Sequence, residues 1–375
     1  MNEKLITHIK IHKKDGQRFI KLLKHHCKNQ TCIDNRFRIK KRDKFLLFPL
    51  VSENFNSQQI IDLLKNKFSF DLVYEKGLIN HNYQPKNLEE LLENKLSNKE
   101  VSMIPHSYDI IGNIAILELN HYDKFQNSDI IKETIAEGII KINQNVESVF
   151  EKKSEIKGTY RLRSIEHLAG VRKTSTIHKE NGCIYKIDIK KSFFTPRLVY
   201  ERKRLSSLEY KKNEIIVDLF AGVGSFSIQI AKEHPVDIYA LDINPDAYDL
   251  LKHNISINNL KGNILPINDD AKLFATNEHR IGKELKGNVN RLIMNLPEKS
   301  LEFIDTAAFL LTKKSKIHLY QFSEKPNSIK KSIEMLKRKL EFFDLSLRKV
   351  FGSRIVKSYS PQADLVVIDA LIEKI

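Results

Sequence analysis

The stretch VDLFAGVGSFSI, residues 217–228, decides the fold. An apolar strand opens into Ala221-Gly222-Val223-Gly224, and a helical sequence follows. Glycines at such a place allow a tight turn and let a ligand approach the backbone closely. A dinucleotide-binding motif would have a third glycine where this chain has Ser227. The loop therefore favours a ligand without a pyrophosphate over NAD.

Acidic residues follow the next two strand sequences. Asp242 ends the strand in LDINP, where a carboxylate can accept hydrogen bonds from both ribose hydroxyls of a nucleoside. Asp270 follows the strand NILPI, within reach of an adenine amino group. A lone aspartate is often only a solvated helix cap, but acids at successive strand ends favour a ligand site. They would repel a phosphate and attract a cation, so they predict S-adenosylmethionine, whose sulfonium is positive.

The same alternation of strand and helix extends through the carboxyl-terminal half of the chain. It predicts a parallel sheet with helices on both faces. No helix separates LRKVFGSRIVKS from ADLVVIDALI, so we expect these strands to form an antiparallel hairpin at one edge. The predicted fold class is α/β: a class I methyltransferase Rossmann-like sheet with an antiparallel C-terminal hairpin, preceded by two small α+β domains.

We expect three domains. Residues 1–75 combine short strand sequences with the helical QRFIKLLKHH, which suits a small α+β module. Residues 76–180 contain a linker helix and a second α+β domain, which includes the strand pair DIIGNIAILEL broken at Gly112. Residues 181–375 form the methyltransferase domain.

The composition indicates a folded protein with a polyanionic partner. Of 375 residues, 41% are hydrophobic and 29% charged, a balance typical of globular proteins. The net charge is +16, which favours nucleic acid, although a general abundance of lysine would also produce it. Cys27, Cys32 and Cys183 lack the spacing of a disulfide framework or zinc site. With no signal peptide or membrane span in the sequence, we expect a cytoplasmic protein that does not bind membranes.

A second strand ends unusually, in RLIMNLPEKS, residues 291–300. The apolar strand stops on Asn295 and continues into Pro297 without a glycine to make the turn. Ligands of open α/β sheets bind at the carboxyl ends of the strands. Enzymes that methylate exocyclic amines usually carry an aromatic residue after Asp/Asn-Pro-Pro. This motif has none, which favours a ring nitrogen as the methylated atom.

Further stretches carry a resemblance to a known family. In the family's order, between about residues 105 and 361, they are SYDIIGNIAILEL, IKGTYRLRSIEHLAG, TIHKENGCIYKIDI, SFFTPRLVYERKR, DLFAGVGSFSI, LDINPDAYDLLKHNISIN, MNLPEKS, IHLYQF and VKSYSP. The chain resembles the archaeal-type tRNA (guanine-37 N1)-methyltransferases. The glycine loop is shared with any class I methyltransferase, whereas TPRLxxER and NLP are more specific. The chain departs from the family at Phe193, where tyrosine is frequent, and at Ser225, where proline is common.

The resemblance implies a methyl transfer from S-adenosylmethionine to N1 of guanosine 37 in tRNA. Guanine N1 carries a proton at neutral pH, so its methylation needs a base, and the charge that grows on O6 needs a partner. The family match implies Glu201 as the base, Arg161 at O6, Asn295 orienting the guanine, and Pro297 shaping its slot. Taken without the match, Glu201 would be only one member of an exposed charged helix.

Further site residues are implied by the same resemblance. The cofactor would be bound by Asp218, Phe220, Gly222, Gly224, Asp242, Ile243, Asp270 and Asn295. The tRNA would be contacted by Arg163, Arg197, Lys153 and Lys357, and its elbow by residues 1–75. Arg161 and Arg163 alternate in TYRLR, so we expect them on one face of a strand. We expect a monomer with no obligate protein partner. The sequence indicates no metal-binding residues and leaves a metal requirement open.

The sequence alone leaves other functions open. The sister enzymes of wybutosine synthesis transfer an aminocarboxypropyl group from the same cofactor, but they generally lack the Pro-Arg-Leu before Glu201-Arg202. A 5-methylcytosine enzyme would need a cysteine near the NLPE strand, and Cys183 lies far upstream. A tRNA-binding protein with a relic sheet would have a degraded glycine loop. An NAD-dependent oxidoreductase is disfavoured by Ser227.

Overall fold

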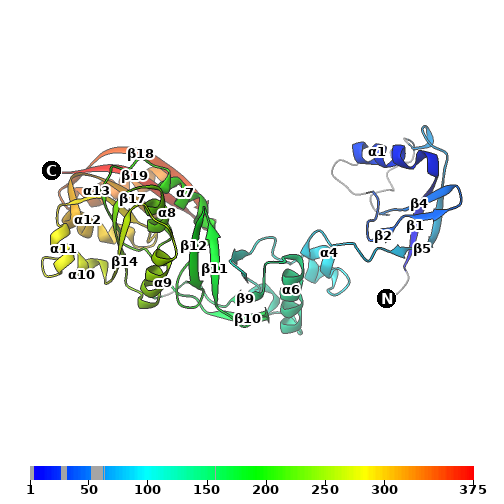
Figure 1. Cartoon of the computed structure of the whole chain (residues 1–375), viewed down its shortest axis with the longest axis horizontal. Coiled ribbons are helices and arrows are strands. Elements are labelled where there is room, and N and C mark those ends of the chain that lie inside the picture. The colour runs from blue at the N-terminus through cyan, green and yellow to red at the C-terminus, as the bar shows by residue number, and fades with distance from the viewer. Residues whose placement is uncertain (1–3, 27–31, 52–61, 63, 157) are drawn as a thin grey trace. The chain divides into compact units, whose positions relative to one another are not determined.

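The computed structural model describes residues 4–26, 32–51, 62, 64–156 and 158–375. The chain divides into two compact units, Met1–Lys86 and Asn87–Ile375 (Figure 1). Each unit has its own hydrophobic core and is described by itself. The division into three domains at residues 75 and 180 stays a prediction.

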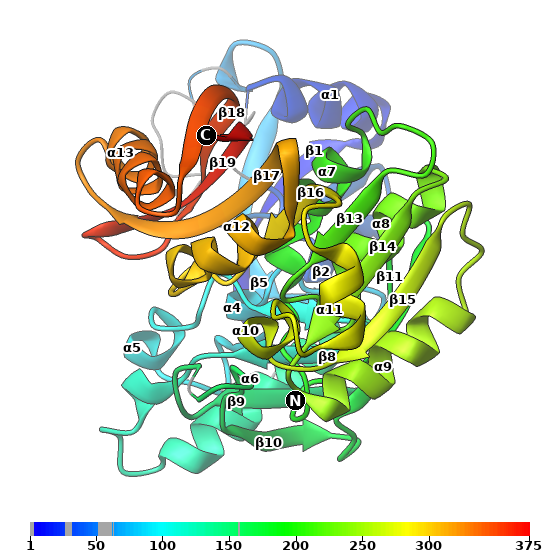
Figure 2. The same ribbon diagram turned by 90° about the vertical axis from the view of Figure 1, so that its left-hand side faces the viewer.

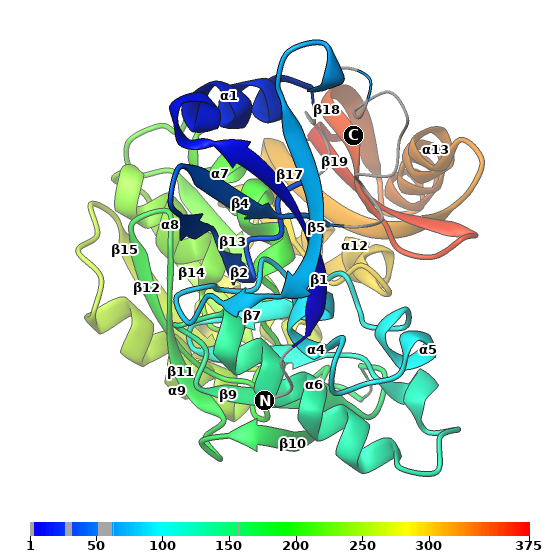
Figure 3. The same cartoon turned by 90° about the vertical axis from the view of Figure 1, so that its right-hand side faces the viewer.

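In its described residues the first unit contains a four-stranded antiparallel sheet, and the helix α1 packs against it (Figure 3). Its strand order is β3-β4-β1-β5, and the core between sheet and helix includes Ile9, Phe19 and Phe48. The elements are β1 (Leu5–His12), η1 (Lys13–Asp15), α1 (Gly16–His26), β2 (Phe37–Arg38), β3 (Lys40–Arg42), β4 (Phe45–Pro49), β5 (Phe70–Lys76) and β6 (Leu78–Ile79).

The cysteines differ in part from the expectation. Cys32 is buried and disulfide-bonded, whereas the spacing of the cysteines predicts no disulfide framework. Cys183 is a buried free thiol, and burial raises its pKa. Cys27 lies outside the described residues.

The second unit begins with a small sheet in the order β10-β9-β8-β7. The helix α6 packs on it, burying Ile131, Ile135 and Ile139 against Val149. The predicted strand pair around Gly112 is confirmed as the hairpin of β7 and β8. The elements are α4 (Leu88–Leu92), α5 (Asn98–Val101), β7 (Asp109–Ile111), β8 (Ile114–Leu117), η2 (Asn120–Tyr122), α6 (Ser128–Ile142), β9 (Ser148–Lys152) and β10 (Ile165–Gly170).

A two-stranded hairpin joins this small sheet to the large one. Its strands are β11 (Ser175–Glu180) and β12 (Cys183–Asp188). One hydrophobic cluster contains Phe150 of the small sheet, Tyr185 of the hairpin and Ile228 of the helix behind the glycine loop. Because these residues share a core, the small sheet and the large sheet belong to one compact unit.

The large sheet has seven strands in the order β15-β14-β13-β16-β17-β19-β18 (Figure 2). The pairs from β15 to β17 are parallel, and β17, β19 and β18 are antiparallel neighbours. The predicted sheet and its C-terminal hairpin are therefore confirmed. The strands are β13 (Ile215–Asp218), β14 (Asp237–Asp242), β15 (Asn263–Asn268), β16 (Val289–Met294), β17 (Leu311–Glu324), β18 (Leu345–Ser358) and β19 (Ala363–Lys374).

Helices cover both faces of this sheet, as its apolar strands require. One face packs on α7, α8 and α9 around Phe226 and Tyr320, and the other packs on α10 to α13 around Phe274 and Leu336. The terminal strand β18 is bulged against β19 at three places. The helices are η3 (Pro196–Leu198), α7 (Val199–Ser206), α8 (Ser225–Glu233), α9 (Pro245–Ser256), α10 (Ala271–Phe274), α11 (Arg280–Leu285), η4 (Ser300–Phe303), α12 (Ile304–Leu310) and α13 (Ser328–Glu341).

Gly112 provides a test of how the small sheet is joined to the hairpin. It has φ +57°, and a Cβ there would meet Thr176 Oγ1 and lie 2.5 Å from the Ile177 carbonyl oxygen. Because backbone must move, Gly112→Ala should lower the free energy of unfolding by about 1–3 kcal/mol. Urea denaturation followed by circular dichroism measures it. Gly158→Ala is the control, since φ is +72° there but no atom lies within 4 Å; equal losses would contradict the packing role.

Candidate active site

The glycine loop joins β13 to α8 and is held by the neighbouring strand. The Ala221 amide donates to the Leu241 carbonyl at 2.7 Å, and the Gly222 amide donates to Asp242 Oδ2 at 2.7 Å. Gly222 and Gly224 both have positive φ, at +56° and +87°. The turn thus needs glycine at both places, and the Asp242 carboxylate fixes it to the end of β14.

Asp218 lies buried at the end of β13, beneath this loop. Its Oδ2 accepts a hydrogen bond from the Ser227 hydroxyl at 2.7 Å, while its Oδ1 has no hydrogen-bond partner among the residues that the structure describes. Burial raises the pKa of Asp218 to about 7, and the nearby Asp242 adds to the shift. Ser227, which stands where a dinucleotide motif has glycine, therefore donates a hydrogen bond to a buried acid.

The other predicted cofactor residues gather along the same edge of the sheet. Asp242 and Asn268 are aligned neighbours on β14 and β15, and Asp270 caps α10 just beyond, accepting from the Lys272 amide at 2.7 Å. Burial also raises the pKa of Asp242. Phe220 packs edge-on against Phe303 with ring centroids 4.9 Å apart. The half-buried Ile243 directly follows Asp242.

The NLPE segment leaves the edge of β16, next to β13. Asp218 and Ile293 are aligned neighbours, which sets Asn295 beside the glycine loop's strand. The turn is closed by Ser300, whose hydroxyl donates to the Met294 carbonyl at 3.1 Å. The Pro297 carbonyl accepts from the Phe322 amide at 3.0 Å. Hydrogen bonds from the buried Ser300 and from β17 thus hold this turn, which contains no glycine.

Arg161 reaches this segment from a turn. Its NH1 lies 2.8 Å from Glu298 Oε2, and its guanidinium lies 5.6 Å from the centroid of the Phe193 ring. The Phe193 carbonyl is also the nearest atom to a Cβ built on Gly222. These contacts bring Arg161, the NLPE segment and the glycine loop together around Phe193.

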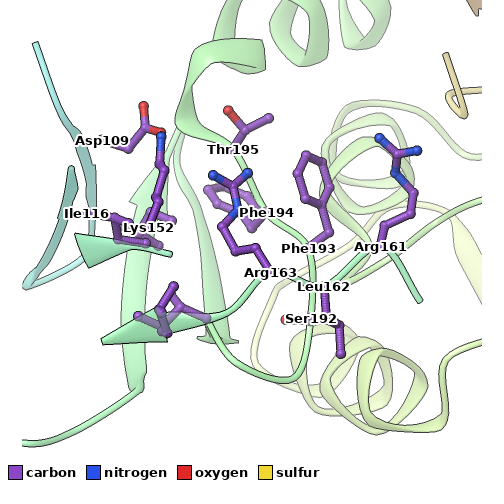
Figure 4. Close-up of a pocket in the computed structure, with 13 residues that line it drawn as sticks. Asp109, Ile116, Lys152, Arg161, Leu162, Arg163, Ser192, Phe193, Phe194 and Thr195 are labelled. Carbon is purple, nitrogen blue, oxygen red and sulfur yellow. The ribbon is translucent and has the colours of Figure 1, made fainter. Parts of the chain in front are cut away.

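The expectation that Arg161 and Arg163 share a strand face is wrong. Residues 158–161 form a turn, in which Arg161 has φ +55° and its amide donates to the Gly158 carbonyl at 3.1 Å. The strand β9 ends at Lys152 and β10 begins at Ile165, so TYRLR lies between strands and the period-2 pattern does not apply. In the view of Figure 4 the Phe193 ring lies between the two arginines. A left-handed conformation at a residue other than glycine is often found at functional sites.

Glu201 is buried on α7, with 2% of its surface exposed. Its Oε2 accepts from the Tyr320 hydroxyl at 3.0 Å and from Arg204 Nε at 3.1 Å. Arg354 of β18 contacts Oε1 and lies 4.5 Å from the Tyr200 ring centroid. Tyr320 follows Leu319, which is aligned with Met294. Glu201 thus lies at the level of Asn295, and the reading of an exposed helical charge does not hold.

Three of the four predicted tRNA contacts gather at a separate basic cluster around Asp109. Arg197 Nε lies 2.6 Å from Asp109 Oδ1. Burial, together with the charges of Arg197, Lys152 and Arg163, lowers the pKa of Lys357. Burial likewise lowers the pKa of Arg163, which lines one pocket with Arg161, Lys152 and Phe194 (Figure 4). We name this set, Lys152, Arg163, Arg197 and Lys357, the Asp109 cluster.

Lys153 lies outside the Asp109 cluster. Its Nζ pairs with Glu151 at 3.2 Å and with Glu166 at 3.3 Å, and these carboxylates raise its pKa against the effect of burial. Sequence reasoning missed Arg204, Tyr320 and Arg354. Tyr320 stands in the quoted IHLYQF stretch, but nothing in the sequence assigned it a contact.

The described part of the chain contains neither a metal-binding group of side chains nor a membrane-spanning helix. No group of three or more His, Cys, Asp or Glu side chains there could hold a metal ion. Among its helices, none has the length and apolar character needed to cross a bilayer.

Comparison with known families agrees with this geometry. A family model described as the TRM5/TYW2 methyltransferase domain matches residues 176–348. Models described as the TYW2 N-terminal domain and the tRNA methyltransferase 5 N-terminal domain match residues 88–174 and 9–58. The fold and the site thus define a methyltransferase of the TRM5/TYW2 class.

Individual relatives show to which family within this class the chain belongs. The tRNA (guanine(37)-N(1))-methyltransferase Trm5b of Methanocaldococcus jannaschii is 34% identical over 371 residues, covering 98% of each chain. A solved complex of aTrm5 and tRNALeu has a TM-score of 0.70 at 33% identity, covering 97% of this chain and 99% of that one. The tRNA(Phe) (4-demethylwyosine(37)-C(7)) aminocarboxypropyltransferase of M. jannaschii is 32% identical over 274 residues, covering 72% of this chain and 98% of that protein. This chain belongs to the tRNA (guanine(37)-N(1))-methyltransferase family, which confirms the resemblance found in its motifs.

Asp218 gives a prediction about stability and pH. In the unfolded chain its pKa is the ordinary 3.8, and in the folded chain it is about 7. Between these values the folded state keeps a proton that the unfolded state has lost, so the carboxyl destabilises the fold increasingly as pH rises. Asp218→Asn removes this effect. Its advantage in free energy of unfolding over the natural chain should grow from about pH 4 to about pH 7 and then level off, as urea denaturation at several pH values would measure. Parallel curves for the two proteins would contradict the assignment.

Proposed function

We propose that this protein transfers the methyl group of S-adenosylmethionine to N1 of guanosine 37 in tRNA, with Glu201 as the general base. Family membership supports the reaction. The observation that carries the mechanism is the placement of a buried carboxylate, Glu201, at the level of Asn295 on the sheet edge that holds the glycine loop.

The residues of the edge fit S-adenosylmethionine. Gly222 leaves open backbone above the strand, and Asp242 retains lone pairs beyond its two backbone hydrogen bonds that can accept from ribose hydroxyls. The Oδ1 of Asp218 has no hydrogen-bond partner among the described residues, and a positively charged ligand would favour the ionised form of this carboxyl, whereas a phosphate would disfavour it. We assign the cofactor contacts to these residues with Phe220, Gly224, Ile243, Asp270 and Asn295. When bound, the cofactor supplies an electrophilic methyl group.

Glu201 accepts the N1 proton as the methyl group bonds to nitrogen. The Arg204, Tyr320 and Arg354 contacts favour its ionised form, so the carboxylate is ready to act without first losing a proton. These donors also weaken it as a base. A weak base suffices, because methylation makes N1 cationic and its proton strongly acidic as the bond forms.

Arg161 stabilises the charge that develops on O6 of the guanine. Its pairing with the half-exposed Glu298 holds the guanidinium beside the NLPE segment, and its remaining N–H groups can donate to the base. Asn295 orients the guanine edge, and Pro297 forms the wall of the slot. Positioning of N1 in line with the methyl donor then accounts for much of the rate.

The Asp109 cluster supports contacts to the RNA backbone. Four cations meet Asp109 and Glu118 there, which leaves an excess of positive charge for phosphates. Arg163, Arg197 and Lys357 thereby keep their proposed role, while Lys153 is neutralised locally and contributes less. The first unit, by family resemblance, contacts the tRNA elbow, and the target base is flipped out of the anticodon loop.

The aminocarboxypropyl transferase among the relatives makes that reaction the second candidate. The stretch Thr195-Pro196-Arg197-Leu198 before Glu201 favours methyl transfer, as the sequence comparison implies.

A direct assay tests the proposal. The protein is incubated with unmodified tRNA carrying G37 and S-adenosylmethionine, and the nucleosides are identified by mass spectrometry. We expect 1-methylguanosine; its absence, or the mass of an aminocarboxypropyl nucleoside, would refute the assignment. Glu201→Gln should slow single-turnover methyl transfer by about 10²–10⁴-fold while the dissociation constants of cofactor and tRNA stay nearly unchanged. Equal loss of binding would indicate a structural role instead.

Lys357→Ala tests the Asp109 cluster. The affinity for tRNA should fall, and the slope of log K against log salt should become shallower by about one unit, as filter binding at several salt concentrations measures. Lys252→Ala is the control, since Lys252 is exposed on α9 and paired with Asp249 at 2.9 Å. A change of slope for both variants, or for neither, would contradict a specific phosphate contact.

A further inference from the structure

The carboxylate of Glu201 is not free to rotate. Two of its donors, Arg204 Nε and the Tyr320 hydroxyl, converge on the same oxygen, Oε2. Tyr320 is fully buried in the core beneath α7 and α8. Arg204 is less buried, so its own orientation must be set by another partner.

That partner is Asp369 of β19. Arg204 NH1 donates to Asp369 Oδ2 at 2.6 Å, and NH2 lies 3.4 Å from Oδ1. A guanidinium is a rigid planar fork, so two contacts to Asp369 determine where Nε points. Arg204 therefore bridges two buried carboxylates, and the position of Glu201 depends on Asp369.

Asp369 is in turn fixed from two sides. His318 Nδ1 lies 2.6 Å from Asp369 Oδ1, and His318 Nε2 lies 3.0 Å from Arg291 NH1. A guanidinium can only donate, so Nε2 accepts and the proton on Nδ1 is donated to Asp369. Burial lowers the pKa of His318, which agrees with a neutral ring. On the other side, a Cβ at Gly352 would lie 2.7 Å from Asp369 Oδ2, so β18 leaves the carboxylate little room.

The charges of this network balance. Its carboxylates are Glu201 and Asp369, and its guanidinia are Arg204 and Arg354. Arg291 and Glu214 form a separate ion pair beyond His318. His318 and Tyr320 add no charge. When Glu201 takes up a proton, the network gains one net positive charge, which disfavours keeping that proton and promotes its release after transfer.

We propose that Asp369, acting through Arg204, is a positioning residue that orients the Glu201 carboxylate and sets its strength as a base. This rests on the proposed role of Glu201. Asp369 does not touch the substrate in this scheme. It holds Arg204 between two acids, so that Arg204 is only partly engaged by Glu201.

Asp369→Asn and Tyr320→Phe should shift the pH dependence of the single-turnover rate in opposite directions. Asp369→Asn removes a negative neighbour and releases Arg204 to pair fully with Glu201. The acid limb of the single-turnover rate should therefore move to lower pH, and the plateau rate should fall about tenfold. Tyr320→Phe keeps the ring in its core but removes a donor to Oε2, so the acid limb should move to higher pH. A network that serves folding alone would give no such opposite shifts.

Glu214→Gln is the matched control. Glu214 is a buried carboxylate paired with Arg291, whose Nε lies 2.6 Å from Glu214 Oε1, and it does not contact Arg204 or Glu201. This variant should lose stability but keep the acid limb and a rate within about twofold of the natural protein. Saturating tRNA and cofactor are used throughout, so that binding defects do not enter the measured rate.

Double variants separate the two proposals. In the Glu201→Gln background, Asp369→Asn should slow the reaction no further. If Glu201→Gln is slow but Asp369→Asn is normal, or if their effects multiply, the positioning role is refuted and Glu201 remains the base. If Glu201→Gln reacts at the natural rate, the proposed function of Glu201 itself fails. Should Asp369→Asn not fold, an unshifted acid limb in Tyr320→Phe would still refute the model of Glu201 held by its donors.

Discussion

The hydrogen bond from the Gly222 amide to the Asp242 carboxylate is the constraint on which the site depends. It ties the loop after β13 to the end of β14, so two strand ends present their polar groups at one place. Asp218, Asp270 and Asn295 then follow from the parallel register of β15, β14, β13 and β16. A parallel sheet aligns the carboxyl ends of its strands, and the contact between Gly222 and Asp242 fixes the loop at these aligned ends.

Much of this edge could be predicted from sequence because its signals are local. The glycines, Asp242 and the NLPE segment each stand directly after an apolar strand, and strand ends in a parallel sheet must meet. The turn at Arg161 could not be predicted, because a positive φ at a residue other than glycine leaves no mark in the sequence. The same holds for the Asp109 cluster, whose members come from β9, the segment between β9 and β10, η3 and β18.

Contacts between residues far apart in the sequence show most clearly what could not be predicted. Arg204 and Asp369 are 165 residues apart, and no periodicity links them. Buried ion pairs cost much of their attraction in lost hydration, so such a network is weak evidence for stability. Its members here, on α7, β17, β18 and β19, lie next to the candidate base. Because of that placement, we propose that the network serves the chemistry of Glu201, not the stability of the fold.

The terminal strand β18 has a consequence of a different kind. A long strand at the end of a sheet exposes unpaired backbone groups, on which another chain can add a strand and start aggregation. In β18 the pairing slips at three places, and the exposed Arg348 and Lys349 interrupt its sequence. Bulges twist the backbone away from a flat ladder, and cations repel a second copy of the same strand. The irregularity of β18 therefore protects the protein from polymerising along its own sheet.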